Sequence, residues 1–321
     1  FQAILEHVTT HPNVGGVLFL AMGCAATLSM NLPATVRRSG RLMETLNTQA
    51  AGTTRNVEAG VEAARAMAGA LAAAKREPVP ASALIVGTKC GASDESSFKY
   101  CHPVVGHACD ILVEQGATVV LSEDCELVPA AHLLAERASG PEVAARLRAL
   151  SNEVNRGWKA RFGYTLEDVV LKTVSREASV QRSLEHAAKA GSGPIRGFFD
   201  VSETIKGPGL VILNAPNTDL ESVTALAAAG CTLTLFTTGR GTPVGSPASI
   251  TLKITATRRT FERMGENIDL CVAGVGEGSE SLEDAARRVV QAAADAANGQ
   301  LTKAEHLHHW EVAIPIRGVT Y

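Results

Sequence analysis

Short apolar runs alternate along most of this chain with segments in which apolar residues recur every three or four positions. Runs such as 83–88 and 118–122 are largely apolar and end in polar residues, a pattern typical of strands buried in a parallel sheet. Segments such as 103–113 and 282–297 have the spacing of amphipathic helices. The alternation predicts an α/β fold with mostly parallel sheets covered by helices, in two Rossmann-like or related layers.

The predicted elements fall into an opening series and a longer later one. A strand at 14–22 is followed by two Ala-rich helices, at about 34–48 and 54–74. Charges and two prolines then interrupt the pattern at 75–80, which is the best candidate for a linker. The later elements are expected in the order strand 83–88, helix 103–113, strand 118–122, helix 129–138, helix 141–158, strand 210–213, helix 220–229, strand 232–237, strand 249–255 and helix 282–297.

Composition narrows the class of protein. The 321 residues carry a net charge of −3, which gives no reason to expect nucleic acid or an anionic membrane as a partner. No apolar run approaches the roughly 18 residues that cross a bilayer, and the first residues do not resemble a signal peptide. The seven cysteines include no Cys-x-x-Cys pair, so we expect free thiols in a reducing compartment and a cytoplasmic protein.

The segment from Cys90 to Gly106, CGASDESSFKYCHPVVG, stands between a predicted strand and a predicted helix. Such folds place ligands at this point, because backbone N–H groups are unpaired there and side chains converge. Ser93, Asp94 and Ser97 could bind a polyol or a metal, or they could cap the following helix. Taken alone, the segment is equally well explained as an ordinary polar loop with a buried cysteine.

The same segment resembles the altronate/galactarate dehydratases, a family of sugar-acid hydro-lyases whose relatives include a sulfolactate sulfo-lyase. The family pattern is matched without gaps by Cys90, Gly91, Ser93, Asp94, Ser97, Pro103 and Gly106. It departs at Ala92, Phe98 and His102, where the family has Gly, Gly and Asn. Further stretches are similar in the family's order, namely 11–13 with 22–24, 121–126 with 130–134, 208–210, 236–241, Met264 and Asp269.

The resemblance also implies a division into domains. Residues 1–77 correspond to part of the family's second domain, without its N-terminal part, and 78–321 correspond to the C-terminal domain. Because Gly-Ser-Gly-Pro occupies 191–194, the alternatives are one C-terminal domain and a division of it into sub-lobes 78–190 and 191–321.

A divalent metal, Fe(II) or Mn(II), is implied by the resemblance. Cys24 and Cys90 stand at predicted strand ends on family positions, so they are the candidate ligands or substrate neighbours. The alternative is that both are small buried thiols. Absence of the metal from this chain is the alternative, because Ala25 and Ala131 replace two family glutamates.

Dehydration of a hydroxy acid requires a base for the proton beside the carboxylate and an acid for the departing hydroxyl. Glu123 and Glu126 follow the strand at 118–122 and are, with Asp94, the candidate catalytic residues. For the two glutamates, electrostatic stabilisation of a helix N-terminus is an equally good explanation.

The sequence Thr237-Thr238-Gly239-Arg240-Gly241 also matches the family and follows a predicted strand. Two hydroxyls, a glycine backbone and an Arg fork favour binding of the substrate carboxylate over an exposed turn. Gln49 matches a smaller family pattern and is a further candidate for substrate binding, or else a helix end. We expect the strand ends before Cys24, Cys90 and Thr237 to converge on one cleft between the two domains.

The predicted function is therefore that of a metal-assisted lyase acting on a small hydroxylated acid such as altronate or galactarate. One alternative is a non-catalytic sugar-acid-binding protein or a subunit of a larger lyase, and another is a sulfo-lyase acting on sulfolactate. The expected partners are a small acid and either a second copy of the chain or a subunit that supplies the family's upstream motif. Departures from the family stand at Ala25, His102, Ala131, Asn214 and Thr257.

Overall fold

The computed structural model describes residues 2–22, 31–201 and 203–314. The chain folds as two compact units, Phe1–Pro80 and Ala81–Tyr321, and the division falls at the end of the charged, proline-containing stretch at 75–80. Each unit is described by itself. In the part of the chain that is described, no helix combines the length and the apolar composition that a membrane span requires.

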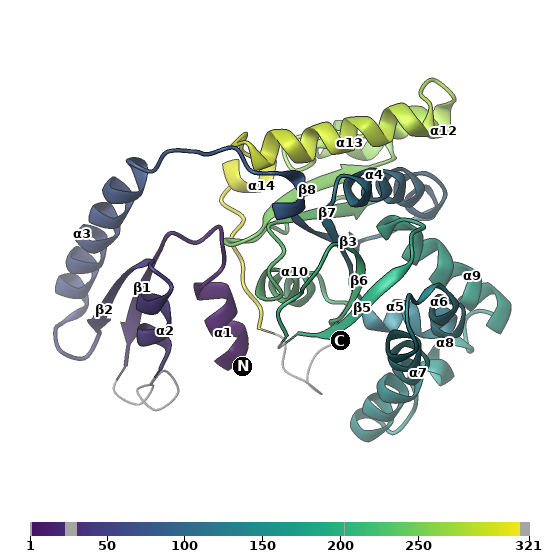
Figure 1. The fold of residues 1–321 in the computed structure, drawn as a ribbon, viewed down its shortest axis with the longest axis horizontal. Helices are drawn as coiled ribbons and strands as arrows, with labels where there is room; N and C mark the ends of the chain where they lie inside the picture. Colours follow the sequence, from purple (N-terminus) through teal and green to yellow (C-terminus); the bar gives the residue numbers. More distant parts are fainter. Residues whose placement is uncertain (1, 23–30, 202, 315–321) are drawn as a thin grey trace. The chain divides into compact units, whose positions relative to one another are not determined.

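The first unit contains a two-stranded parallel sheet with its helices (Figure 1). Its elements are α1 (Gln2–Thr9), β1 (Gly16–Ala21), α2 (Leu32–Arg38), β2 (Leu42–Asn47) and α3 (Thr53–Ala72). The prediction of one helix over 34–48 is wrong in its second half, which forms β2. The helix ends before Gly40, which adopts a left-handed φ of 78°, and β2 then pairs along the whole of β1.

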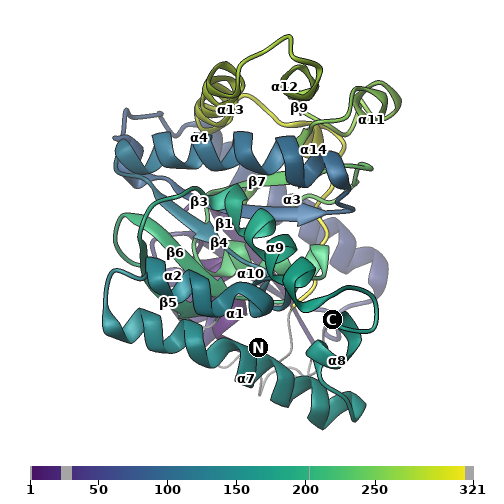
Figure 2. The same ribbon diagram turned by 90° about the vertical axis from the view of Figure 1, so that its right-hand side faces the viewer.

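The second unit is built on seven described strands, all paired in parallel in the order β5-β6-β4-β3-β7-β8-β9 (Figure 2). Their bounds are β3 Ile85–Gly91, β4 Thr118–Leu121, β5 Ile195–Asp200, β6 Gly209–Asn214, β7 Leu233–Thr238, β8 Ile250–Thr255 and β9 Leu270–Cys271. The predicted α/β class is confirmed. The ranges 78–190 and 191–321 contribute strands to this same sheet, so the possible sub-lobes share one sheet.

Alternate residues of the central strands pack on opposite faces of the sheet. On β4, Val119 and Leu121 join the larger core with helices α4, α7 and α13, whereas Val120 joins a smaller core with α10. The longer helices are α4 (His102–Glu114), α7 (Pro141–Phe162), α9 (Arg176–Ala187), α10 (Asp219–Ala228) and α13 (Leu282–Ala297). Shorter ones are α5 (Asp124–Leu127), α6 (Ala131–Leu134), α8 (Leu166–Val170), α11 (Arg258–Arg263), α12 (Ala273–Glu277) and α14 (Lys303–His306).

Most long elements of the second unit match their predictions within a few residues. The predicted helix 129–138 instead consists of the short turn Val128–Ala130, the helix α6 and the turn Ala135–Arg137. The sequence pattern also missed α9 and β5. α9 is rich in polar residues, and β5 contains an arginine and a glycine, so neither has the apolar run on which the other predictions rested.

Candidate functional site

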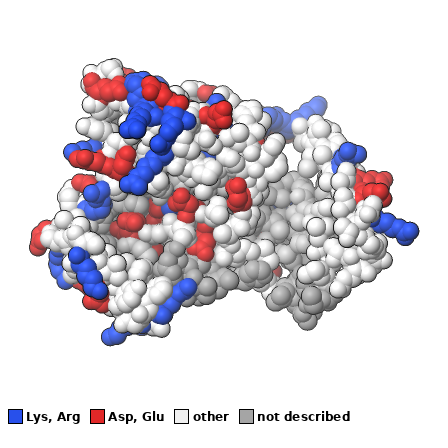
Figure 3. Space-filling view, turned by 180° about the vertical axis from the view of Figure 1, so that it is seen from behind, with Lys and Arg blue, Asp and Glu red and all other residues white. Residues whose placement is uncertain are grey.

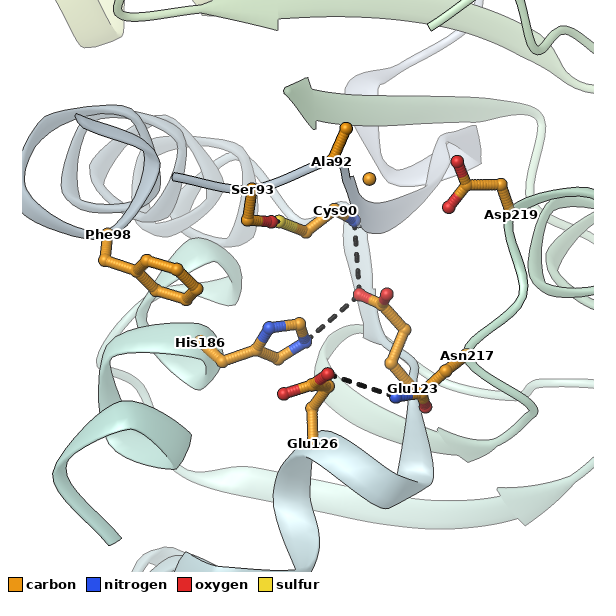
Figure 4. Close-up of a pocket in the computed structure, with 10 residues that line it drawn as sticks. Cys90, Ala92, Ser93, Phe98, Glu123, Glu126, His186, Asn217 and Asp219 are labelled. Atoms are coloured by element: carbon orange, nitrogen blue, oxygen red, sulfur yellow. Dashed lines mark hydrogen bonds and ion pairs between the residues drawn. The ribbon is translucent and has the colours of Figure 1, made fainter. Parts of the chain in front are cut away.

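A pocket of about 280 Å³ lies where β3, β4 and β6 end, at the carboxyl edge of the sheet (Figure 4). Parallel strands end together at this edge, so loops from distant parts of the sequence meet there. The pocket is lined by Cys90, Gly91, Ala92, Ser93, Phe98, Glu123, Glu126, His186, Asn217 and Asp219. Figure 3 shows acidic side chains gathered in a hollow on the face of the molecule opposite to that of Figure 1.

Glu123 is the most constrained residue of the pocket. It is 2 % exposed, and its backbone adopts a left-handed φ of 78°. Its carboxylate pairs with Lys89, with Lys189 at 2.9 Å and with Nε2 of His186 at 3.1 Å. Burial alone would raise the pKa of Glu123, but the ammonium groups of Lys189 and Lys89 hold that pKa well below its usual range. Glu123 is therefore an ionised carboxylate in a dry environment.

The ammonium group of Lys89 has several polar partners at the edge of the pocket. Its ammonium group lies 3.1 Å from Oδ1 of Asp219 and donates at 2.8 Å to each of the backbone carbonyls of Cys90 and Asn217. Burial would lower the pKa of Lys89, but Glu123 and Asp219 raise it above the ordinary value. The lysine therefore stays charged and fixes the ends of β3, β4 and α10 around the pocket.

Cys90, which lines the pocket, forms a thiol–imidazole pair with the buried His102 behind it. Nδ1 of His102 donates to the carbonyl of Glu185 at 3.0 Å, which leaves Nε2 as an acceptor 3.1 Å from Sγ of Cys90. Nε2 is also 3.1 Å from the hydroxyl of Thr237, but that hydroxyl donates to the carbonyl of Lys89 at 3.2 Å. The thiol is consequently the donor to His102, and its sulfur also contacts Oγ of Ser93.

The pair is neutral near neutral pH. Burial, with the positive charge of Lys189, lowers the pKa of His102 well below its usual value, while burial and Glu123 raise the pKa of Cys90. His102 also packs edge to face with His186, with the ring centroids 5.8 Å apart at 89°. Burial and Lys189 lower the pKa of His186 as well, so it too is a neutral imidazole.

Four of the predicted site residues line this pocket, namely Cys90, Ser93, Glu123 and Glu126. Oε1 of Glu126 accepts a hydrogen bond from the side-chain amide of Asn217 at 3.3 Å. Asp94 and Ser97 lie beside the pocket without lining it. The carboxylate of Asp94 accepts hydrogen bonds from Oγ of Ser96 at 2.6 Å and from the backbone N–H of Ser97 at 3.1 Å, which is the predicted capping geometry.

The predicted carboxylate-binding motif at 237–241 contributes none of the residues that line the pocket. Thr237 and Thr238 are buried, and Oγ1 of Thr238 accepts a hydrogen bond from the N–H of Gly241 at 2.9 Å. Gly239 is packed so closely that a Cβ atom there would lie 2.3 Å from Cγ of Asp94. Arg240 is exposed, and binding of a carboxylate by this arginine stays a prediction.

The remaining predicted residues belong to the first unit. Gln49 is exposed in the turn after β2, and its N–H donates to Oδ1 of Asn47 at 3.0 Å. Cys24, with Ala25, lies outside the described residues. Because each unit is described by itself, convergence of the three strand ends on one cleft also stays a prediction.

Sequence reasoning missed five residues of the site: Lys89, His186, Lys189, Asn217 and Asp219. A signal was available for Lys89, because a lysine inside a run of buried strand residues must have partners of opposite charge. His186 and Lys189 lie at the end of the unpredicted helix α9 and in the turn after it. No sequence pattern indicated that these two residues reach the pocket, and only the fold shows it.

The departures from the family pattern have different structural consequences. Ala92 adopts a left-handed φ of 50°, a conformation that suits the glycine of the family pattern. Ala131 is buried in the larger core, and Asn214 donates to Oδ1 of Asp200 at 2.8 Å. The hydroxyl of Thr257 is 2.7 Å from that of Ser96. His102 therefore stands out, because it replaces the family's Asn in direct contact with Cys90, which lines the pocket.

The fit of a divalent metal depends on the donors that the site can offer. Within residues 2–22, 31–201 and 203–314, no group of three or more His, Cys, Asp and Glu side chains is arranged to hold a metal ion. The ionised Glu123 is already surrounded by two lysines, and the thiol of Cys90 donates to His102. The described residues thus do not by themselves fit the predicted Fe(II) or Mn(II), and Cys24 is outside them.

Comparisons with known proteins agree with the motifs along the whole chain. The family model described as D-galactarate/altronate dehydratase, C-terminal, matches residues 81–320, and the one described as D-galactarate dehydratase/altronate hydrolase, second domain, matches residues 1–72. Altronate dehydratase of Bacillus subtilis is 32% identical over 99% of this chain and 64% of its own length.

Two further relatives differ in their reactions. The (2R)-sulfolactate sulfo-lyase subunit beta of Chromohalobacter salexigens is 32% identical over 75% of this chain and 63% of its own length. Galactarate dehydratase (L-threo-forming) of Escherichia coli is 29% identical over 92% of this chain and 58% of its own length. The chain thus spans less than two thirds of the length of each of these relatives.

Proposed function

Because the chain belongs to the D-galactarate/altronate dehydratase family, we propose that it carries the site of a hydro-lyase that removes water from a small hydroxylated carboxylic acid such as altronate or galactarate. The observation that supports this proposal is the pocket in which four motif residues meet His186, Asn217 and Asp219. The chain covers only part of its longer relatives, so the activity of the whole protein belongs to the proposal.

In this proposal, His186 is the base that takes the proton from the carbon beside the carboxylate. Figure 4 shows its ring between Glu123, Glu126 and the Cys90–Ser93 pair. Nε2 of His186 lies 3.1 Å from Glu123 and also contacts the ammonium group of Lys189, which can only donate. In the proposed tautomer, Lys189 donates to Glu123 at 2.9 Å, Nε2–H donates to Glu123 as well, and Nδ1 carries the lone pair. The Glu123 carboxylate then stabilises the imidazolium that forms, as an orienting carboxylate does for a catalytic histidine.

The departing hydroxyl needs a proton, and the thiol of Cys90 is the proposed donor. Its raised pKa keeps it protonated, and it lines the same pocket as His186. The carbon–hydrogen bond breaks to His186, the carbon–oxygen bond breaks, and water leaves with the thiol proton. The resulting enol becomes the keto acid when solvent delivers a proton to its carbon and takes one from its oxygen, and His186 returns its proton to the thiolate through solvent, which restores both groups.

The acidic lining suits the hydroxyl groups of the substrate. Glu126 and Asp219 are acceptors for hydroxyl donors, and the side-chain amide of Asn217 can donate as well as accept. A divalent metal also belongs to the proposal. Some of its ligands would come from residues outside those described, and it would act as a Lewis acid. A second copy of the chain or a partner subunit, and a cytoplasmic location, likewise remain proposals.

The test is an assay of the protein with altronate, galactarate and sulfolactate, with and without added Fe(II) or Mn(II). A keto-deoxy acid product is expected, and substitution His186→Gln is expected to lower kcat by roughly 10²- to 10⁴-fold, the contribution of a general base. His132→Gln is the matched control, because His132 is exposed on α6 and does not line the pocket. It should leave kcat unchanged.

The alternatives give different results in the same assay. Release of sulfite from sulfolactate, without a keto-deoxy product from either sugar acid, would support the sulfo-lyase, which the likeness to the sulfo-lyase subunit favours. Binding of an acid without turnover under any metal condition would support a non-catalytic binding role. Either result would contradict the hydro-lyase proposal.

A further inference from the structure

The lining of the pocket has a charge that does not match an acid substrate. The side chains of Glu123, Glu126 and Asp219 are carboxylic, and none of the lining residues is Lys or Arg. Lys89 and Lys189 lie behind the lining, fully buried, and each pairs with Glu123. The three carboxylates outnumber the two ammonium groups, so a carboxylate that entered the pocket would meet a net negative charge unless a cation at the rim received it.

Arg182 provides a cation at that rim. It lies on α9 four residues before His186, so the two side chains project from the same side of the helix, about 6 Å apart along its axis. Its guanidinium lies 4.1 Å from the ring centroid of Phe98, and Phe98 lines the pocket. The ring of Phe98 in turn packs against His102 at 5.0 Å.

The guanidinium of Arg182 has hydrogen-bonding capacity left for a ligand. Its side chain is 54 % exposed, and its ion pair with Glu185 is long, with 3.9 Å between Nε and Oε2. A guanidinium that lies over the face of an aromatic ring keeps an N–H edge free for a ligand, and this edge matches a carboxylate in a bidentate pair. Phe98 therefore acts as a platform that holds this edge at the rim.

We propose that Arg182 binds the carboxylate of the acid substrate at the rim of the pocket, with its guanidinium supported by Phe98. This inference rests on the proposed function. Binding by Arg182 gives the substrate one orientation. The carboxylate lies outward beside Arg182, and the hydroxyl groups face Glu126 and Asp219. The carbon next to that carboxylate then lies within one helical turn of His186.

The test compares an acid with an uncharged polyol of the same carbon skeleton. Titration calorimetry is carried out with galactarate and with galactitol on the wild type, Arg182→Gln, Arg182→Lys and Arg176→Gln. We expect Arg182→Gln to weaken galactarate binding by about 10- to 100-fold, the loss typical of a charge-assisted hydrogen bond. Arg182→Lys should also weaken it, because a lysine keeps the charge and loses the stacked fork.

Two controls separate carboxylate binding from a general disturbance of the pocket. Arg176 lies on the same helix and pairs with Glu167, so Arg176→Gln should leave galactarate binding unchanged. Galactitol carries no carboxylate, so its affinity should be equal in the wild type and in Arg182→Gln. In kinetic assays, Arg182→Gln should raise KM for galactarate much more than it lowers kcat.

The possible results distinguish this inference from the function on which it rests. Equal affinity of the wild type and Arg182→Gln for galactarate overturns the role of Arg182 and leaves the hydro-lyase proposal in place. A matching loss for galactitol also overturns it, because the pocket itself would then be disturbed. If the wild type binds neither galactarate, altronate nor sulfolactate, the proposed function fails together with the inference.

Discussion

The two halves of the carboxyl edge of the sheet carry family-like motifs, yet they are built in opposite ways. Beyond β3, β4 and β6 the chain forms a pocket around a buried, ionised Glu123. Beyond β7 and β8 the motif at 237–241 packs its glycine against Asp94 and leaves Arg240 exposed. Although it follows a strand end, the motif at 237–241 contributes no residue to the lining of this pocket.

The halves differ in what holds them together. In the pocket half, Glu123 gives up hydration and adopts a left-handed φ, and two lysines compensate its charge. In the half beyond β7, neutral hydroxyls and backbone groups are paired, as in the hydrogen bond of Thr238 with Gly241. A costly arrangement of buried charges beside a pocket is a better indication of a functional site than a strand-end motif whose polar groups are paired with one another.

The largest expected effect is that of removing the charge of Glu123. Glu123→Gln leaves Lys89 and Lys189 buried without their main counter-charge, so the free energy of unfolding should fall by about 3–5 kcal/mol. The matched change in the other half is Thr238→Val, which removes one buried hydrogen bond and should cost about 1 kcal/mol. Urea unfolding of both variants measures the difference. A loss for Glu123→Gln no greater than that for Thr238→Val would contradict the comparison.

His102 connects the two halves through Cys90 and Thr237, and it predicts a pH dependence. Its folded-state pKa is lowered by burial, so below about pH 6.5 the unfolded chain binds a proton that the folded chain does not. The free energy of unfolding should therefore fall as the pH is lowered from 6.5 towards the folded-state pKa, by about 1.4 kcal/mol per pH unit for this histidine.

The measurement compares the wild type with His102→Asn in urea unfolding at several pH values between 7.5 and 5. Groups that do not contact His102 contribute equally to both proteins, whereas His186 packs against His102 and acts in the same direction. Asp124, whose pKa burial raises to about 6, acts in the opposite direction. The variant should show the shallower decline at acid pH. Parallel curves for the two proteins would show that His102 titrates normally in the folded state.

The sequence predicted the strands of the second unit well, because β4 and β6 are short runs rich in Val, Leu and Ile, and β3, β7 and β8 combine apolar residues with Thr. It failed at β2, whose Leu-Met-Glu-Thr-Leu-Asn follows a helix directly and is stabilised as a strand by pairing with β1. Such pairing is a tertiary effect, which local periodicity cannot report.

The site was predictable in part for a related reason. Cys90, Ser93, Glu123 and Glu126 follow strands that the apolar pattern identified, so their meeting at one edge could be expected. Their partners could not be found in the same way. His186 and Lys189 reach Glu123 from α9 and the turn after it, and no local pattern relates these positions to β4. Pairing of charges across a fold becomes visible only when the strand order is known.

The smallest expected effect is that of Arg240→Lys on the binding of the acid. It tests whether the half beyond β7 takes part in binding at all. If Arg182 binds the carboxylate next to the reacting carbon, Arg240 is left for the second carboxylate of a diacid, since β7 pairs with β3 at the same edge. Arg240→Lys should then weaken binding of galactarate, which has two carboxylates, and leave binding of altronate, which has one, unchanged. Because Arg240 is exposed, the loss should be less than about fivefold, below about 1 kcal/mol. Calorimetry with both acids measures it, and an equal or larger loss for altronate would assign the reacting carboxylate to the 237–241 motif instead of to Arg182.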